Sequence, residues 1–518
     1  MFTKHKIAMG VSAGILGAVG VITSAQAVHL NPDGTGQVLL FPYFNAEEGY
    51  QTNINLVNST DQTKAVKIRF REGKYSNDIL DFNLYMSPED VWSGTVRAGP
   101  DGAGNLIGHL RTTDRTCALP LEAAADCEAK DANGKSRCES VVPFTGHNLY
   151  KNVSAADTRE GYVEVIEMGV VEDAAVKAGV LHHNGKPADC KSVEDAWISG
   201  AFAQGAGAAA KGLSAPTGGL FGSSAVLNVA AGSAFALDPV AIDNYSTQAQ
   251  HYLSHDPDKF LLPSLASGDV SKSSVMVRKP SGEAELVITN WQQTQDACLN
   301  DGDALTPACG TNPYPLAHVL LAPNLMNEYY LDSTFGYDGH TDWVVTFPMK
   351  KHGIHAAKTD VLANFENGIY DREEGRANWT APTGGGVTSG GFGFSPPVGI
   401  NATVDDSSRL LREVNVISFK STDLSYNATR TVLSSPAKQT LSVGPFISGW
   451  ARLSFPDYDL SNGFVSATAY SASPAVYAAD SNIYKGVPAT GVAFIEGTTG
   501  GTGGHRLGDA MPHKIQRD

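Results

Sequence analysis

The sequence predicts a mostly β protein made of antiparallel β-sandwich domains, Ig-like or jelly-roll-like, with a few short helices and long Gly/Ala-rich loops. Two observations lead to this prediction. Several segments alternate apolar and polar residues with a period of two, which is typical of strands that bury one face. The 518 residues include 54 glycines and 26 prolines but only 18% charged residues, and this composition favours short strands joined by turns.

The first expected strands follow one another closely near the N-terminus. Within Ala65–Arg71, Val66, Ile68 and Phe70 share one face and three basic residues share the other, and Leu80–Met86 has a similar alternation. We expect each strand to bury its apolar face and to leave the other face in water. Because the connections are short turns, we expect an antiparallel meander. The expected strands of this region are 37–41, 53–58, 65–71 and 80–86.

Later segments carry further strands and two short helices. We expect helices at 172–179 and 192–204, the second with Ser192 as its N-cap and Asp195 completing a capping box. Residues 200–235 are rich in Ala, Gly and Ser, which indicates close approach of the backbone or flexibility rather than an ordinary core. The remaining expected strands are 161–169, 285–291, 342–347, 414–419, 449–455, 463–470 and 491–495.

Residues 1–27 have the three-part pattern of a cleaved secretory signal. Lys4 and Lys6 give a positive start, residues 7–22 are apolar, and Ala25–Ala27 supplies the small residues that a signal peptidase requires. We therefore expect a secreted protein, located in the periplasm, at the cell surface or in the medium, with no later membrane-spanning segment. Beyond this signal we expect sandwich strands at 28–110, a Cys-bearing loop with short helices and an Ala/Gly-rich insert at 111–270, central strands at 271–350, a Gly-rich loop region at 351–400 and C-terminal strands at 401–518.

The charge balance argues against one class of partner. The chain carries a net charge of −16, and loss of Lys4 and Lys6 with the signal makes it two units more negative. Nucleic acids require a basic protein face, so we do not expect them as partners.

The six cysteines are expected to form disulfides, because their number is even and the chain carries an export signal. Cys298 and Cys309 flank a short segment rich in turn-forming residues, so we expect them to be joined. The other four, Cys117, Cys127, Cys138 and Cys190, allow three pairings, and the sequence does not choose among them.

No linear motif indicates catalysis. The sequence contains neither the Gly-x-Ser-x-Gly elbow of serine hydrolases nor the His-Glu-x-x-His motif of zinc proteases. Glu164 and Glu167 are three residues apart on one expected strand, so they should lie on opposite faces, one solvated and the other hydrogen-bonded. The acidic and basic residues of 371–376 are expected to form a surface ion network. The sequence therefore favours a protein that is not an enzyme and leaves the question open.

The histidines provide one candidate metal site. If Gln248–His255 were helical, His251 and His255 would share a face and could hold a divalent ion, although Pro257 would end such a helix at once. No cofactor is indicated.

The tryptophans bear on carbohydrate binding, which uses exposed aromatic rings. Trp92, Trp291, Trp343 and Trp450 lie on or beside expected strands, so we expect them in the core, whereas Trp379 is expected to be exposed.

Two segments resemble parts of secreted bacterial proteins that are usually described as uncharacterised or cell-surface proteins. They are Asn31–Val38 (NPDGTGQV) and Leu80–Leu84 (LDFNL). The resemblance covers about a fifth of the chain and consists of turns and strands. It implies an exported bacterial protein and carries no activity with it.

Taken together, these features predict an exported bacterial structural or binding protein that acts at the cell surface or in the extracellular space. A surface ligand, a carbohydrate or a second copy of the chain are the partners that this hypothesis allows. The alternatives are a secreted hydrolase with a site built from distant residues of a β scaffold, and a secreted metal-binding protein.

Overall fold

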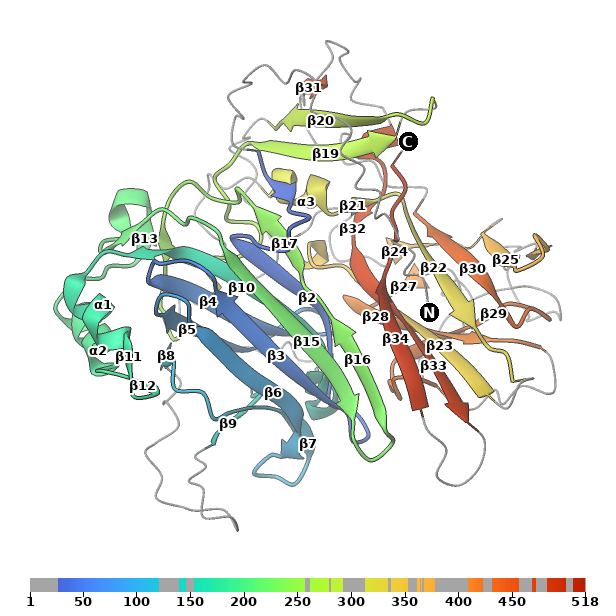
Figure 1. Ribbon diagram of the computed structural model, residues 1–518, viewed down its shortest axis with the longest axis horizontal. Helices are drawn as coiled ribbons and strands as arrows, with labels where there is room; N and C mark the ends of the chain where they lie inside the picture. The colour runs from blue at the N-terminus through green and yellow to red at the C-terminus, as the bar shows by residue number, and fades with distance from the viewer. Residues whose placement is uncertain are drawn as a thin grey trace, which may run out of the picture.

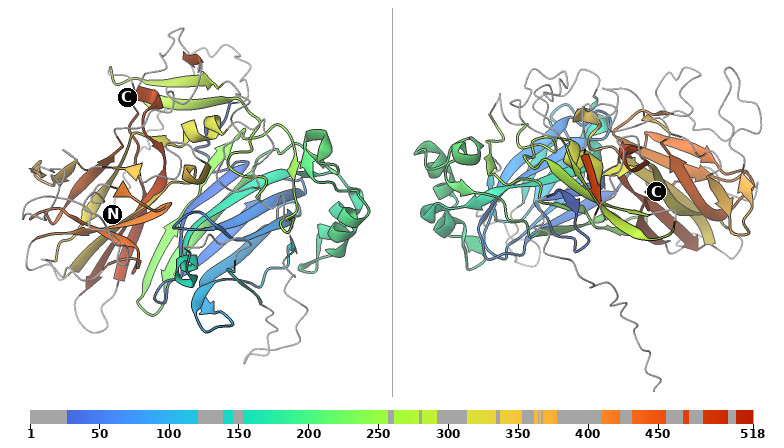
Figure 2. Two further views of the ribbon diagram at one scale, coloured as in Figure 1. Left: turned by 180° about the vertical axis from the view of Figure 1, so that it is seen from behind. Right: turned by 90° about the horizontal axis from the view of Figure 1, so that it is seen from above.

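The computed structural model confirms the mostly β fold. Its sheets are antiparallel apart from one strand pair, and three short α-helices lie among the described residues. Two β bodies lie side by side, and a small third sheet lies over one end of the molecule (Figures 1 and 2). The structure describes residues 27–120, 139–145, 153–256, 261–278, 281–291, 313–333, 337–352, 361–363, 365, 368–377, 409–422, 431–455, 468–471, 482–499 and 506–517.

The N-terminal body consists of two sheets that share one core. The first has the order β1-β17-β2-β10-β4-β5-β8, with β14 beside β10, and the second has the order β16-β15-β3-β6-β7-β9. Apolar side chains from both sheets, such as Phe41, Val66, Trp92 and Leu110, meet in one buried cluster. The strands are β1 His29–Leu30, β2 Val38–Asn45, β3 Gln51–Asn58, β4 Lys64–Glu72, β5 Asp78–Met86, β6 Val91–Pro100, β7 Leu106–Thr112, β8 Cys117–Leu119, β9 Ser140–Pro143, β10 Glu160–Val171, β14 Leu213–Ser214, β15 Leu220–Asn228, β16 Ser233–Leu237 and β17 Val240–Asp243.

The predicted N-terminal strands are present, but they do not follow one another as a meander, so that prediction of strand order is wrong. The chain passes from β2 to β3 in the opposite sheet, and β10 lies between β2 and β4. Every residue of β10 is buried. A strand that is buried on both faces is best placed in the middle of a sheet, so a segment remote in sequence separates two strands that are close in sequence.

The Ala/Gly-rich segment 200–235 contributes to the core, contrary to the sequence-based interpretation, because it contains β15 and part of β16. Close approach of the backbone is confirmed at Gly222. A Cβ atom at this position would lie 2.5 Å from the carbonyl oxygen of Asn55 and 2.8 Å from the ring of Phe41. Small residues here therefore allow β15 to pack closely against β3 and the opposite sheet.

Both predicted helices exist in shorter form. Asp173 caps the first, and its carboxylate accepts hydrogen bonds from the amides of Ala175 and Val176. The Ser192 cap of the second is wrong, because this helix begins one residue earlier and Ser192 donates to the carbonyl of Asp189. Among the described residues, no helix is both long and apolar enough to cross a membrane. The helices are α1 Ala174–Val180, α2 Lys191–Ile198 and α3 Tyr314–Val319, and the 3₁₀ turns are 155–159, 207–209, 350–352 and 482–484.

The C-terminal body also has two sheets, with the orders β22-β30-β25-β26 and β29-β28-β23-β33-β34. Within the second, β28 and β29 are the parallel pair. A shared cluster that includes Tyr43, Phe235, Val344 and Phe494 joins this body to the N-terminal one. The strands are β22 Asn324–Tyr330, β23 Tyr337–Thr346, β25 Ile369–Asp371, β26 Arg376–Ala377, β28 Val414–Lys420, β29 Lys438–Ser442, β30 Ser448–Ser454, β33 Thr490–Thr499 and β34 Arg506–Pro512.

The third sheet, β19-β20-β31, packs with α3 over a core that includes Trp291 and Tyr484. Its strands confirm the predicted strand at 285–291 and the described part of the one at 463–470. The strands are β19 Lys272–Arg278, β20 Ala284–Asn290 and β31 Thr468–Ser471, and two-stranded pairs are formed by β11 His182–His183 with β12 Lys186–Pro187, β13 Gly205–Ala206 with β18 Gln250–His251, β21 Leu321–Ala322 with β32 Val487–Pro488, and β24 Val361–Leu362 with β27 Arg409–Leu410.

The polar face of β4 is not in water, contrary to expectation. Lys67, Arg69 and Arg71 are all buried. Arg69 lies 2.8 Å from the Asp78 carboxylate (Nε to Oδ2) and 3.3 Å from Glu164 (Nη1 to Oε2). Arg71 Nε lies 3.2 Å from Glu164 Oε1. We call the residues Lys67, Arg69, Arg71, Asp78, Asp81 and Glu164 the buried charge network.

A remote segment covers this network. Lys67 Nζ donates to the hydroxyl of Ser254, and Arg69 donates to the carbonyl of Pro263. Burial by itself would raise the pKa of Glu164, but Arg71 and Arg69 outweigh it and hold the pKa at about 2. The network contains three cations and three carboxylates, so the buried charges balance.

Glu167, which was expected to differ from Glu164 in exposure, is buried as well. It lies 2.6 Å from Lys64 Nζ and accepts hydrogen bonds from the amides of Thr217 and Gly218. The two acids therefore have separate partners, and the expected solvated carboxylate is wrong because both faces of β10 are covered.

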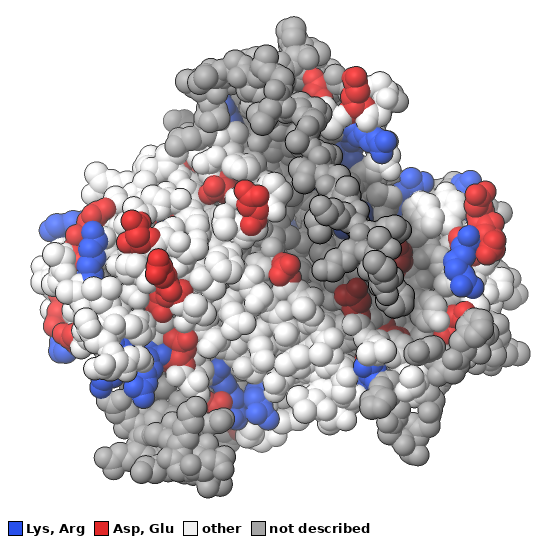
Figure 3. Space-filling model, in the orientation of Figure 1, with Lys and Arg blue, Asp and Glu red and all other residues white. Residues whose placement is uncertain are grey.

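The outer face of the six-stranded sheet is free of charge over most of its area. Figure 3 shows a broad white region over β3, β15, β6 and β16, with the charged side chains gathered around it.

Candidate functional site

The candidate site lies on the outer face of the sheet β22-β30-β25. On β30, Ala451 and Leu453 point into the core, so the alternating residue Trp450 points outward. Trp450 pairs across the sheet with Glu328 of β22 and with Tyr370 of β25. Three strands thus bring an acid and two aromatic side chains into one row, because residues directly opposite each other in neighbouring strands share a face.

This row borders a pocket of about 720 Å³. The volume lies within the range of small-molecule sites, roughly 300–1,000 Å³. Its walls combine aromatic rings with charged side chains, a mixture suited to a polar ligand that has apolar faces. The lining residues are Glu328, Tyr329, Tyr330, Tyr370, Asp371, Arg372, Glu374, Ser448, Gly449, Trp450 and Ile495.

Trp450 is the aromatic platform of the pocket. Its indole stacks on the ring of Tyr370 with centroids 4.5 Å apart and planes inclined by 8°. The side chain is 37% exposed, so the prediction that Trp450 belongs to the core is wrong. Trp92, Trp291 and Trp343 are buried as predicted, and Trp379 lies outside the described residues.

The carboxylates come from β22 and from the turn after β25. Asp371 organises this turn, because its Oδ1 accepts hydrogen bonds from the amides of Glu373 and Gly375. Glu374 adopts a left-handed backbone conformation (φ 65°), which is uncommon for a residue other than glycine and often occurs at functional sites. An ion network was expected within residues 371–376. Arg372, however, pairs outside this segment, with the carboxylate of Asp332 at 3.9 Å.

The two histidines of the predicted metal site lie in a different setting from the one expected. Gln250–His251 is a strand and the residues up to Asp256 form a turn, so the helix that would align His251 with His255 does not exist. His251 is buried, whereas His255 is exposed. Within the described part of the chain, no group of three or more His, Cys, Asp or Glu side chains is arranged to hold a metal ion.

The ring of His251 is already engaged. Trp197 donates to the hydroxyl of Tyr85, and this hydroxyl lies 3.0 Å from His251 Nε2. Whichever tautomer the ring adopts, this hydrogen bond occupies Nε2. Burial lowers the pKa of His251 to about 3, so the ring is neutral.

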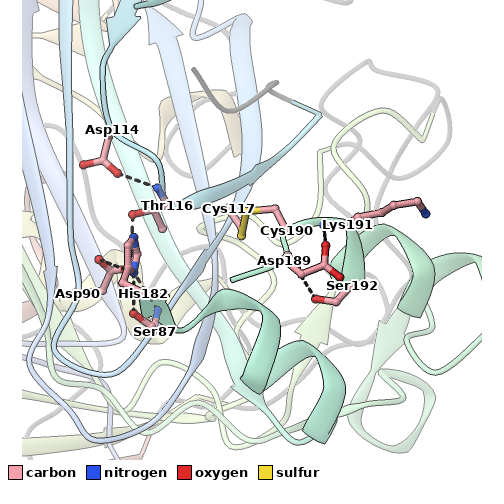
Figure 4. Close-up of a disulfide and its surroundings, with 10 residues drawn as sticks. All are labelled: Ser87, Asp90, Asp114, Thr116, Cys117, His182, Asp189, Cys190, Lys191 and Ser192. Atoms are coloured by element: carbon pink, nitrogen blue, oxygen red, sulfur yellow. Dashed lines mark hydrogen bonds and ion pairs between the residues drawn. A yellow bond between two sulfur atoms is a disulfide. The ribbon is translucent and has the colours of Figure 1, made fainter. Parts of the chain in front are cut away.

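A disulfide joins Cys117 of β8 to Cys190 at the start of α2 (Figure 4). It resolves one of the pairings that the sequence left open. Cys127 and Cys138 lie outside the described residues, as do Cys298 and Cys309, so the Cys298–Cys309 disulfide stays a prediction.

A Ser, a His and an Asp meet near this disulfide, but they do not form a catalytic triad. Ser87 Oγ lies 3.1 Å from His182 Nδ1, and Asp90 Oδ1 lies 3.8 Å from the same nitrogen (Figure 4). In a triad the serine and the carboxylate contact opposite nitrogens of the imidazole, so that a proton can pass through the ring. Asp90 instead accepts from the Ser87 amide and the Thr116 hydroxyl, which is a structural role.

Removal of the Cys117–Cys190 disulfide is expected to destabilise the protein by about 2–4 kcal/mol, because the bond closes a long loop in the unfolded chain. The two cysteines are 73 positions apart. Urea unfolding of the double variant Cys117→Ser/Cys190→Ser measures the loss. An unchanged unfolding midpoint, or alkylation of either cysteine in the non-reduced parent protein, would contradict this pairing.

The pocket was not predicted from the sequence, although one signal for it is present. Within Ser448–Ser454 (SGWARLS), Trp450 alternates with Ala451 and therefore shares a face with Arg452, which indicates an outward position. No protein-family model, curated protein or solved structure matches the chain.

Proposed function

We propose that this chain is an exported binding protein that recognises a carbohydrate in the pocket around Trp450. The observation that carries this proposal is the part-exposed indole, stacked on Tyr370 and flanked by carboxylates. The predicted secretory signal and the Cys117–Cys190 disulfide support export, because disulfides persist in oxidising compartments.

The chemistry of the walls suits a sugar. The apolar face of a pyranose ring packs against an aromatic ring, as other apolar surfaces do, while its hydroxyl groups donate to carboxylates. Tyr370 holds the Trp450 ring in place from one side, so little freedom is lost when a ligand binds. Glu328 and Glu374 supply acceptors at the rim, and Arg372 supplies donors.

Replacing Trp450 with Ala is expected to weaken binding at least about tenfold, because the stacking surface is lost. The measurement is calorimetric titration of the mature protein with a panel of soluble cello-, xylo-, manno- and chito-oligosaccharides. Trp450→Phe should retain part of the affinity.

Tyr75→Ala serves as the matched control, since Tyr75 is a similarly exposed aromatic residue (41%) and does not line the pocket. The control should bind as the parent protein does. Equal losses in Trp450→Ala and Tyr75→Ala, or failure of every sugar to bind the folded parent protein, would refute the proposal.

A secreted hydrolase is the second candidate, and it is favoured by the presence of several carboxylates in one pocket. Glycoside hydrolysis uses two carboxyl groups on either side of the scissile bond. Asp371 holds its own turn, so Glu328 and Glu374 are the candidates. Release of reducing ends from the oligosaccharide panel, abolished in both Glu328→Gln and Glu374→Gln, would establish this activity in place of simple binding.

A further inference from the structure

The outer face of the six-stranded sheet has an unusual composition. On β15, β3 and β6 the outward residues are amides, hydroxyls and small or apolar side chains, and Arg97 at one end is the only charged residue among them. On β16 the outward residues are Ala234 and Ala236. We call this surface the neutral face; its members are Gln51, Asn53, Asn55, Val57, Val91, Ser93, Thr95, Arg97, Phe221, Ser223, Ala225, Leu227, Ala234 and Ala236.

The strand register arranges these residues in straight rows across the sheet. Phe221 lies opposite Val57, which lies opposite Val91, and this row is apolar. The next row joins Ser223, Asn55 and Ser93. The row after that joins Ala236, Ala225, Asn53 and Thr95. Short side chains therefore make up the middle rows of the face, which allows another sheet to approach closely there.

The side chains also lie open to solvent. Phe221 is 40% exposed and Val91 is 50% exposed. Figure 3 shows the white region uncovered in front of β3 and β15. Sheet faces in water normally carry interspersed charges of both signs, and these oppose association. The neutral face lacks that protection.

We infer that the neutral face is a docking surface for a second copy of this chain, packed sheet against sheet. The chain carries a net charge of −16, so most contacts between two copies would bring like charges together. The neutral face itself contains no acidic residue, so contact over it avoids most of this repulsion. The charged side chains that adjoin it lie at one edge, where Arg111 of β7 is opposite Thr95 and Asp114 accepts from the Ser93 amide. Two flat sheet faces pack about 10 Å apart, with short side chains interlocking between them.

The size of the face indicates a weak dimer. Four strands about 4.8 Å apart and seven residues long at about 3.4 Å per residue cover roughly 19 Å by 24 Å. This area is smaller than the roughly 800 Å² per partner of a standard stable interface. Association is therefore expected only at high protein concentration.

Sedimentation velocity of the mature protein tests this inference, over a range from about 1 µM to about 500 µM. The sedimentation coefficient should rise with concentration toward that of a dimer. Because salt screens the repulsion between the acidic surfaces outside the interface, association should become stronger as salt is added. An interface held by ion pairs would respond in the opposite direction.

Asn55→Glu should abolish the rise, because it places two carboxylates at the centre of the contact. Ala236→Glu provides a second disruptive variant on β16, in case the first fails to fold. Ile198→Glu is the matched control: it adds the same charge at a residue that is 83% exposed at the end of α2, and it should associate as the parent protein does.

A parent protein that stays monomeric at every concentration and salt level would overturn the inference, as would unchanged association of folded Asn55→Glu and Ala236→Glu. Retention of a monomeric parent on insoluble cellulose or chitin, lost in Asn55→Glu, would assign the face to a polysaccharide and would also overturn it. These outcomes do not depend on the Trp450 pocket, so each proposal can fail without the other.

Discussion

Replacing Glu164 with Gln is expected to lower the free energy of unfolding by about 3–5 kcal/mol, because it leaves the buried charge network with three cations and only two carboxylates. Glu164 is the partner of both Arg69 and Arg71, and all three side chains are buried. A neutral amide can accept a hydrogen bond from a guanidinium but carries no negative charge, so Arg71 loses its counter-ion and Arg69 keeps only Asp78. Urea unfolding of the parent and variant proteins at pH 7 measures the difference.

Glu172→Gln is the matched control. Glu172 pairs with Lys177 at 3.2 Å, but both side chains are largely exposed, so the same substitution should cost less than about 1 kcal/mol. Similar losses for the two variants would show that the buried charge network does not stabilise the protein in the way its geometry indicates.

A steep loss of stability below about pH 4.5 is the second expected result, and buried histidines are its main cause. Burial lowers the pKa of His251, His318 and His352 to about 3 and that of His513 to about 4. The unfolded chain binds these protons near the ordinary value of about 6.5. The neutral rings therefore make their full contribution to the free energy of unfolding above pH 6.5, and this contribution is lost as the pH falls toward 3.

Buried acids offset this loss over part of the range. Burial raises the pKa of Glu47 and Glu413 to about 7 and that of Asp342 to about 6. Their contribution is present below their ordinary pKa of about 4 and is lost as the pH rises through 6 to 7. The two effects oppose each other between about pH 4.5 and 6.5, and burial also raises the pKa of Glu72, Glu160 and Glu167, so no steep loss of stability is expected there. Below about pH 4.5 only the destabilisation by the buried histidines remains. Protonation of Glu164, whose pKa is about 2, lowers the stability further.

His318 is the best single test of this pH dependence. Trp291 donates to Ser273 Oγ, the Ser273 hydroxyl lies 2.8 Å from His318 Nδ1, and His318 Nε2 lies 3.3 Å from the carbonyl of Ile483. The carbonyl of Ile483 can only accept, so Nε2 carries a proton, and because burial lowers the pKa of His318 to about 3, the ring is neutral and Nδ1 accepts from Ser273. His318→Gln keeps a donor for Ile483 but cannot titrate.

The variant is expected to flatten the dependence of unfolding free energy on pH between 6.5 and 3, by up to roughly 4 kcal/mol over the whole interval. Urea unfolding at a series of pH values measures this slope. His183→Gln, at an exposed histidine, should leave the slope unchanged. If His318→Gln had the same dependence of unfolding free energy on pH as the parent protein, His318 could not be a neutral buried ring.

The fold class could be predicted because strand periodicity is local. The alternation in Ala65–Arg71 places each side chain on the correct face of β4. What the alternation could not show is that the polar face would be buried, since Ser254 and Pro263 cover it from almost two hundred residues away. Three basic residues on one strand face normally indicate solvent, and only the matching acids of β5 and β10 make burial possible.

The pocket is hard to predict for a related reason. The outward position of Trp450 follows from its neighbours in sequence, but its partners Tyr370 and Glu328 come from two other strands. Their meeting depends on the strand order β22-β30-β25, which no local pattern contains. The spacing of His251 and His255 shows the converse: it suits a helix, yet the pairing of β18 with β13 makes Gln250–His251 a strand.

A structure of the protein determined with a bound oligosaccharide is the most direct test of the central claim, that the pocket around Trp450 holds the ligand. Crystals soaked with the tightest-binding sugar of the panel are expected to show a pyranose ring packed on the Trp450 indole, with hydroxyl groups within hydrogen-bonding distance of Glu328 or Glu374. A sugar bound elsewhere with this pocket empty, at a concentration that saturates binding in solution, would contradict the account.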